Sequence, residues 1–221
     1  MSVNGGPDII TDGLRMFLDA SNPLSYPGTG TLWLDLSQNA FTGSLINTPT
    51  FNGPSRVSSF SFNGTDEYAV LPAATMPTSF NYTKVVWFQL ASYSTSNNIF
   101  SGGASIGQHA FWMFTSQYLN AGHNGAWSTV TSTSIIPLNI WTFGAVSFST
   151  TSGWKLYVNG VLEDTDPSTT TFTDGFGAAL GAYVDGNFLT GSISQAYLYN
   201  RALTDAEVIQ IYTDTRTRFG K

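Results

Sequence analysis

The 221 residues predict an all-β fold, a two-sheet antiparallel jelly-roll sandwich with one short C-terminal helix. Before residue 190, short alternating or apolar segments are separated by turn residues every ~8–12 residues, as in sandwiches and barrels. One amphipathic helical pattern follows this region. All-β domains commonly run to ~200–250 residues. We therefore expect one domain over residues 12–212, between an N-terminal arm (1–11) and a solvent-exposed C-terminal tail (213–221).

The first half of the chain contains three strand signals. Gly13–Asp19 alternates in polarity and predicts a first strand. Phe60 and Phe62 alternate with serines until Asn63-Gly64 interrupts the run, and the alternation resumes after it. An Asn-Gly pair between two such runs predicts a β-hairpin. Lys84–Leu90 is apolar on both faces, which indicates a central strand covered on both sides.

The second half repeats these patterns. Ala110–Thr115 (AFWMFT) is again apolar on both faces. Trp154–Asp164 has alternating residues around Asn159-Gly160, and this dipeptide is favoured in two-residue type I′ turns. The sequence therefore predicts a β-hairpin centred on Asn159-Gly160.

The final strand should be irregular. Ile193, Ala196 and Leu198 are all apolar but do not share one parity, so a regular strand cannot direct all three to the same face. An extra residue in one strand corrects such a mismatch. We therefore predict a β-bulge near Ser194–Gln195.

The helix start is clearly marked. Thr204 is a candidate N-cap, and Glu207 stands three residues later, as in a capping box. Leu203 and Val208 occupy the positions of a hydrophobic staple. These signals predict a helix beginning directly after Thr204.

Composition excludes several classes of function. Charged residues make up 10% of the chain, against the roughly 25% usual for soluble domains. The net charge is −6 and no basic cluster stands out, so we expect no nucleic-acid partner. Cysteine is absent, which excludes disulfides and thiol chemistry. No apolar run approaches the ~20 residues of a membrane span, so we expect no membrane insertion, and no secretion signal is visible at the N-terminus.

An ordered series of short motifs resembles the laminin-G-like, pentraxin-related branch of the concanavalin A-like lectin/glucanase superfamily. The motifs are Gly13-Leu14, Phe17-Leu18-Asp19, Trp33-Leu34-Asp35-Leu36-Ser37, Ser61-Phe62-Asn63-Gly64-Thr65-Asp66-Glu67-Tyr68, Leu156-Tyr157-Val158-Asn159-Gly160, Leu180-Gly181, Gly191-Ser192-Ile193 and Tyr199-Asn200-Arg201-Ala202-Leu203-Thr204. The resemblance implies two antiparallel sheets. Residues 19–37 also resemble loops of tailed-phage structural proteins.

From this resemblance we expect a non-enzymatic structural or attachment module on the exterior of a phage particle, as a capsid decoration or a tail or fibre component. Its partners would be other virion proteins or copies of itself, with possible contact to cell-surface polysaccharide. The alternatives are a stand-alone extracellular lectin or adhesion module and a glycoside hydrolase. A hydrolase needs paired carboxyl groups. The three glutamates, Glu67, Glu163 and Glu207, lie in no such pair along the chain.

Two sets of residues are candidate sites. Sugars present apolar C–H faces and many hydroxyl groups, so aromatic platforms beside amides or carboxylates bind them. Calcium, the ion usual in this family, takes oxygen ligands; no other cofactor is expected. The glycan candidates are Tyr118, Asn120, His123, Asn124, Trp127, Tyr183, Asp185 and Asn187, and the calcium candidates are Asp12, Asp19, Asn63 and Asp66.

Overall fold

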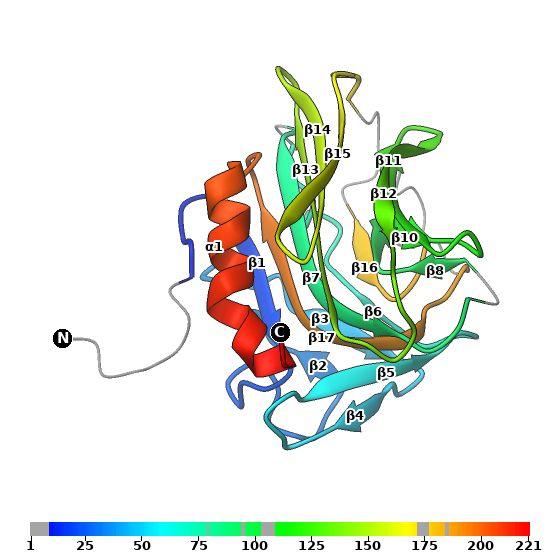
Figure 1. The fold of residues 1–221 in the computed structure, drawn as a ribbon. Helices are drawn as coiled ribbons and strands as arrows, with labels where there is room; N and C mark the ends of the chain where they lie inside the picture. The colour runs from blue at the N-terminus through cyan, green and yellow to red at the C-terminus, as the bar shows by residue number, and fades with distance from the viewer. Residues whose placement is uncertain (1–8, 79, 94–95, 103–108, 172–176, 184–185) are drawn as a thin grey trace.

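The protein is a sandwich of two antiparallel layers with a helix on one outer face (Figure 1). The computed structural model describes residues 9–78, 80–93, 96–102, 109–171, 177–183 and 186–221. One layer is an 8-stranded sheet. Its strand order is β15 (Val161–Asp166), β14 (Gly153–Val158), β13 (Thr142–Ser149), β7 (Tyr82–Leu90), β17 (Thr190–Tyr199), β5 (Ser59–Asn63) and β4 (Thr50–Asn52), and β1 (Leu14–Asp19) also pairs with β17.

The other layer is made of two smaller sheets. Where they meet, Phe111 N donates to Ser101 Oγ at 3.0 Å and Ile99 N donates to Phe111 O at 2.9 Å. The predicted two-layer sandwich is thus confirmed, with its second layer divided. The 4-stranded sheet has the order β12 (Ala126–Ile135), β11 (Tyr118–His123), β10 (His109–Met113) and β8 (Asn97–Asn98); the 5-stranded sheet has the order β2 (Leu32–Trp33), β3 (Gly43–Ile46), β6 (Tyr68–Val70), β16 (Ala178–Leu180) and β9 (Phe100–Gly102).

Strand β7 is the predicted central strand and separates two apolar cores. Val86 and Phe88 belong to the core between the layers, and Val85 and Trp87 belong to the core beneath the helix. All four side chains are fully buried. Because a strand alternates its side chains, a run that is apolar on both faces is what a strand between two cores requires.

The helix, α1 (Asp205–Arg216), starts where the sequence predicts. Thr204 accepts from Glu207 N, and the Glu207 carboxylate accepts from Thr204 N at 2.8 Å, so the capping box is confirmed. Leu203 and Val208 are both buried in the core beneath the helix, as a hydrophobic staple requires. Within the described residues, no helix combines the length and the apolar character that crossing a membrane would need.

The expectation of a solvated tail after Thr213 is wrong. α1 continues to Arg216, and a 3₁₀ turn, η1 (Thr217–Phe219), follows it. The Phe219 ring stacks on Trp87 with 4.0 Å between ring centroids, and Arg218 pairs with Asp19 at 2.7 Å. The end of the chain therefore completes the second core. At the other end, Ile9 and Ile10 of the expected arm pack against the same core, and residues 1–8 lie outside the described part.

The predicted irregularity in β17 is confirmed. The pairing of β17 with β7 shifts between Ile193 and Gln195, which inserts Ser194 as a bulge. As a result Ile193, Ala196 and Leu198 all face the core between the layers.

Of the two predicted hairpins, one forms. Asn159 and Gly160 have φ values of 49° and 78° between β14 and β15, as a type I′ turn requires. The prediction of a hairpin at Asn63-Gly64 is wrong, because β5 belongs to the 8-stranded sheet and β6 to the 5-stranded sheet. The Asn63 side chain accepts from the backbone N of Thr65 and of Asp66. This turn therefore carries the chain from one layer to the other.

Candidate functional site

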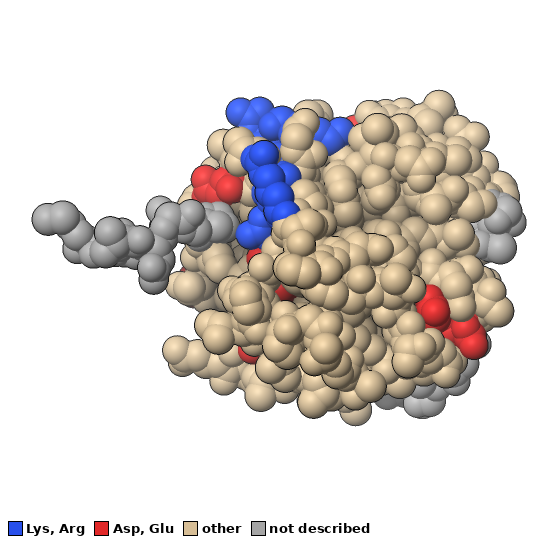
Figure 2. All heavy atoms as spheres, turned by 90° about the horizontal axis from the view of Figure 1, so that it is seen from below, with Lys and Arg blue, Asp and Glu red and all other residues tan. Residues whose placement is uncertain are grey.

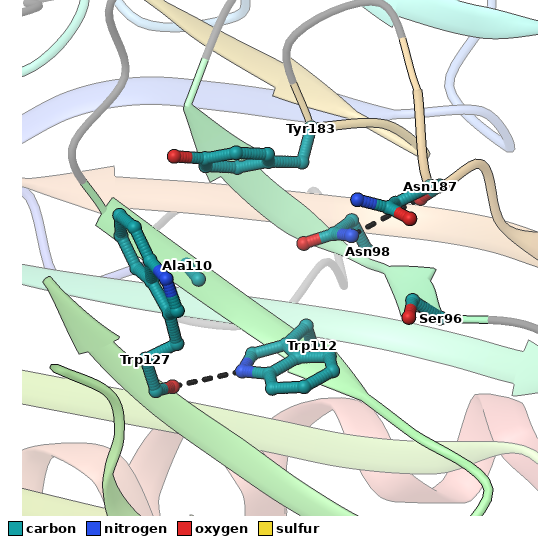
Figure 3. A pocket seen from close by; sticks show the side chains of 7 residues that line it. All are labelled: Ser96, Asn98, Ala110, Trp112, Trp127, Tyr183 and Asn187. Atoms are coloured by element: carbon teal, nitrogen blue, oxygen red, sulfur yellow. Dashed lines mark hydrogen bonds between the residues drawn. The ribbon is translucent and has the colours of Figure 1, made fainter. Parts of the chain in front are cut away.

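A hollow opens on the outer face of the 4-stranded sheet, the face turned away from the core between the layers (Figure 3). Its volume is ≈ 160 Å³. It is therefore smaller than the ~300–1,000 Å³ pockets that enclose drug-sized ligands. The residues that line it are Ser96, Asn98, Ala110, Trp112, Trp127, Tyr183 and Asn187.

Strand β10 supplies the floor of the hollow. Phe111 and Met113 lie in the core between the layers, so Ala110 and Trp112 face outward. Trp112 lies directly opposite Asn98 of β8 on one side and Asn120 of β11 on the other. An indole flanked by two amides thus forms one row across the outer face.

The turn between β11 and β12 brings a second indole over this sheet. Gly122 faces outward beside the floor, and a Cβ atom there would lie 1.8 Å from the carbonyl oxygen of Ala126. Glycine is therefore required for the chain to fold back so closely. The Nε1 atom of Trp112 donates to the carbonyl oxygen of Trp127 at 2.8 Å, which links the wall of the hollow to its floor.

The loop between β16 and β17 forms the opposite wall. Tyr183 and Gly186 exchange two backbone hydrogen bonds of 3.0 Å. The Tyr183 ring lies 5.5 Å from the Trp127 ring, at an interplanar angle of 66°. The carbonyl oxygen of Asn187 accepts from Asn98 Nδ2 at 3.0 Å. Two segments distant in the sequence therefore meet across the hollow, as Figure 3 shows.

The polar groups of the hollow are uncharged. Asn98 is 4% exposed; its Oδ1 accepts from Ser101 Oγ at 2.7 Å, and its Nδ2 gives one of two amide hydrogens to Asn187. Among the described residues, Trp127 Nε1 and Tyr183 Oη have no hydrogen-bond partner. Burial raises the pKa of Tyr183, so its hydroxyl stays protonated at neutral pH. The hollow therefore combines aromatic faces with neutral donors and acceptors.

The sequence of the chain matches a known family over more than half of its length. The family model described as the concanavalin A-like lectin/glucanases superfamily matches residues 63–209. The chain belongs to this superfamily. No curated protein matches it.

Several solved structures share the fold of this concanavalin A-like domain at low sequence identity. Trypanosoma rangeli sialidase in complex with sialic acid matches at 16% identity with a TM-score of 0.69, over 95% of this chain and 34% of the sialidase. Domain 4 of AbnA, a GH43 extracellular arabinanase from Geobacillus stearothermophilus, in complex with arabinotriose, matches at 20% identity and TM-score 0.70, over 90% of this chain and 98% of that domain.

A third match is botulinum neurotoxin type C, from a study of its interaction with two ganglioside molecules. Identity is 13% and the TM-score 0.68, over 92% of this chain and 51% of the toxin chain. The chain thus spans about a third of the sialidase and half of the toxin chain, but nearly all of the arabinanase domain. At these identities the likeness establishes the fold alone.

The structure brings together three of the glycan candidates predicted from the sequence. Trp127, Tyr183 and Asn187 line the hollow. Asn120 lies on the same face, but its amide donates to Tyr118 O at 2.7 Å and accepts from Thr131 Oγ1 at 2.8 Å.

The remaining candidates lie apart from the hollow. Tyr118, at the start of β11, is half-buried and does not line it. Asn124 is exposed in the β11–β12 turn. Asp185 lies outside the described residues.

The prediction that His123 contacts a surface ligand is wrong. Its side chain faces the interior, is 4% exposed, and lies 4.6 Å from the Phe148 ring and 4.5 Å from the Trp154 ring. Its Nε2 atom donates to the carbonyl oxygen of Thr170. Burial lowers the pKa of His123 to about 4, so the ring is neutral at pH 7.

Sequence reasoning missed Ser96, Asn98, Ala110 and Trp112. Trp112 lies in the segment AFWMFT, which is apolar at every position before the threonine, so no polarity difference marks its outward face. Parity alone places Trp112 opposite to Phe111 and Met113. That signal becomes useful only once the core face of β10 is known.

The four calcium candidates are not brought together. The Asp19 carboxylate accepts from Arg218 and from Gln195 Nε2, and Asp12 pairs with Arg201 at 2.9 Å. Asn63 and Asp66 hydrogen-bond to each other within their turn. Among the described residues, no three His, Cys, Asp or Glu side chains form a group that could hold a metal ion.

The three glutamates stabilise backbone elements. Glu163 accepts from the backbone N of Thr133 and of Ser134, both at 2.8 Å, and thereby joins β15 to β12. Glu67 accepts from Asn63 N at 2.9 Å, and Glu207 caps α1. Each carboxylate therefore has hydrogen-bond partners elsewhere in the fold, and none of the three lines the hollow.

Proposed function

We propose that this concanavalin A-like domain is a non-enzymatic carbohydrate-binding module that holds one sugar unit of a glycan in the hollow. The observation that carries the proposal is the group of three aromatic rings around amide side chains on the outer face of the 4-stranded sheet. Trp112, Trp127 and Tyr183 supply the rings, and Asn98 and Asn187 supply the amides. The arabinotriose complex of a domain with this fold, which the chain matches over 98% of that domain, adds support.

Binding would follow from two kinds of contact. The Trp127 and Tyr183 rings present apolar surface to the C–H face of a sugar. The free amide hydrogen of Asn98 and the Trp127 N–H donate to its hydroxyl groups. The hollow is small, so we expect a Kd in the micromolar range or weaker. The corresponding binding free energy is no more favourable than about −8 kcal/mol.

The absence of catalysis is part of the proposal. A glycosidase places two carboxyl groups across the scissile bond, ~5–9.5 Å apart. No carboxylate belongs to the described lining of the hollow, and Glu67 and Glu163 have structural partners. Sugar release that disappears in Glu67→Ala or Glu163→Ala would establish a hydrolase instead.

The setting we propose is the exterior of a phage particle, with virion proteins or further copies of this chain as partners. The support is the loop resemblance of residues 19–37 and the low charge of the surface. Mass spectrometry of purified particles tests this setting. Recovery of the chain only as a free secreted protein would favour the alternative, a stand-alone lectin.

Binding itself is tested with a glycan array followed by calorimetry. Trp127→Ala should weaken binding by about 30-fold or more, because removing a central aromatic contact typically costs ~2 kcal/mol. The folded state should be preserved, since Trp127 is only half-buried. Leu24→Ala is the control, because Leu24 is 76% exposed and does not line the hollow. Unchanged affinity in Trp127→Ala would refute the proposed site.

A further inference from the structure

We propose that the sugar unit held in the hollow is uncharged, a neutral hexose or pentose rather than a sialic or uronic acid. This inference rests on the proposed function and specifies its ligand. The positions of all the cationic side chains and the hydrogen-bonding capacity of the lining support a neutral ligand.

Six of the eight Lys and Arg residues lie in or against the C-terminal segment, residues 201–221. α1 and η1, which make up most of this segment, cover the 8-stranded sheet on the side opposite the hollow (Figure 1). Figure 2 accordingly shows the basic side chains gathered in one part of that view. The six are Arg201, Arg216, Arg218 and Lys221 within the segment, Arg56, which donates to Thr217 O, and Lys155, which pairs with Asp205.

The other two basic side chains, Arg15 and Lys84, also lie away from the hollow. Arg15 donates to the carbonyl oxygens of Ala74 and Thr75 and lies 4.6 Å from the centre of the Phe41 ring. Lys84 is fully buried between the layers, where its Nζ donates to Phe100 O at 2.8 Å. Every Lys and Arg of the chain lies in a described segment, and none lines the hollow.

A carboxylate in the hollow would therefore lose hydration without gaining an ion pair. Proteins recognise such groups mainly with Arg or Lys, because charge-assisted hydrogen bonds are roughly twice as strong as neutral ones. Partial burial of an unpaired carboxylate is unfavourable, and the net charge of −6 adds long-range repulsion.

The lining suits hydroxyl groups, which both donate and accept. Asn98 offers one N–H and a remaining lone pair on Oδ1, and Ser96 and Tyr183 carry hydroxyl groups of their own. A carboxylate can only accept, so an acceptor of this lining that faces it finds no donor there, whereas a hydroxyl group at the same position can supply one.

The test uses pairs of oligosaccharides that differ only in the oxidation state at C6, glucose-terminated against glucuronate-terminated, with calorimetry on the wild-type chain. We expect the neutral member to bind at least tenfold more tightly, with an affinity that stays constant between low and high salt. Equal or tighter binding of the glucuronate, weakened by salt, would overturn the inference while leaving carbohydrate binding intact. If no neutral or acidic glycan binds, the inference fails together with the proposed function.

A gain-of-function variant provides the second measurement. Ser96→Arg adds a cation at the rim of the hollow, and Ser96→Gln adds comparable bulk without charge. The arginine variant should reduce the ratio of neutral to acidic sugar affinity by about tenfold, as expected for ~1.4 kcal/mol from one added ion pair. Its affinity for the acidic sugar should also fall as salt is added. The glutamine variant should keep the wild-type ratio. An unchanged preference in the arginine variant would show that charge does not decide specificity.

Discussion

The two outer faces of the sandwich use tryptophan in opposite ways. On the 8-stranded sheet, Trp87 is fully buried, stacked on Phe219, and its Nε1 donates to Thr215 Oγ1 at 2.8 Å. On the 4-stranded sheet, Trp112 and Trp127 are partly exposed around a hollow. The chain has one α-helix in its described part, and that helix covers the first face.

The difference indicates where stability and recognition reside. Covering Trp87 adds a second core and joins the end of the chain to the centre of the sheet. Leaving Trp112 and Trp127 uncovered keeps apolar surface in contact with water, and such exposed apolar surface beside polar groups is typical of binding sites. Changes to the two faces should therefore separate stability from ligand binding.

The largest effect should come from Trp87→Ala. Removing a fully buried aromatic side chain typically costs ~3–5 kcal/mol. Urea unfolding should record this loss, with Trp87→Phe as a control that retains the ring and loses the hydrogen bond to Thr215. A loss below about 1 kcal/mol in Trp87→Ala would mean that the helix is not a structural cover for this sheet.

Acid should weaken the layer that carries the hollow. The pKa of His123 is lowered to about 4 by burial, whereas an exposed histidine titrates near 6.5. As pH falls, the unfolded chain therefore binds the proton before the folded chain does. The contribution of His123 to the free energy of unfolding is fully present above pH 6.5 and is lost as pH decreases toward 4. The loss is on the order of 3 kcal/mol. Burial also lowers the pKa of His109, which acts in the same direction.

Urea titrations between pH 7.5 and 4.5 measure this effect. Glu207, whose pKa is lowered to about 2 by Arg201, loses its contribution only below pH 4.5, so the two groups act in different windows. His123→Gln retains a donor toward Thr170 and removes one of the two histidine titrations, so it should make the profile shallower above pH 4.5 and leave the contribution of His109. If the free energy of unfolding of the variant depends on pH as steeply as that of the wild type, groups other than His123 cause the acid sensitivity.

Local signals in the sequence were enough to locate the helix start and the bulge in β17. The capping box involves residues three apart, and the bulge follows from the parity of neighbouring residues. The turn at Asn63-Gly64 was misassigned because the local pattern is the same whether the next strand pairs with β5 or crosses to the other layer. The docking of Phe219 was missed because its partner, Trp87, is far away in the sequence.

The candidate site was predicted in part for the same reason. Trp127, Tyr183 and Asn187 stand in or beside loops with polar neighbours, so their residue types indicated exposure. His123 has similar neighbours but ends β11 with its ring directed inward, which depends on strand parity and on Phe148 and Trp154 from other strands.

The smallest effect should come from Tyr118→Ala, which tests how far the site extends across the outer face of the 4-stranded sheet. Tyr118 is a sequence-predicted glycan contact on the same 4-stranded sheet, yet it does not line the hollow. We expect its removal to change affinity by less than about twofold, or ~0.4 kcal/mol, whereas Tyr183→Ala should weaken binding clearly. Calorimetry with the same neutral oligosaccharide measures both. A loss in Tyr118→Ala as large as that in Tyr183→Ala would extend the binding surface along β11, and the ligand would then be a chain lying across the sheet rather than one unit in the hollow.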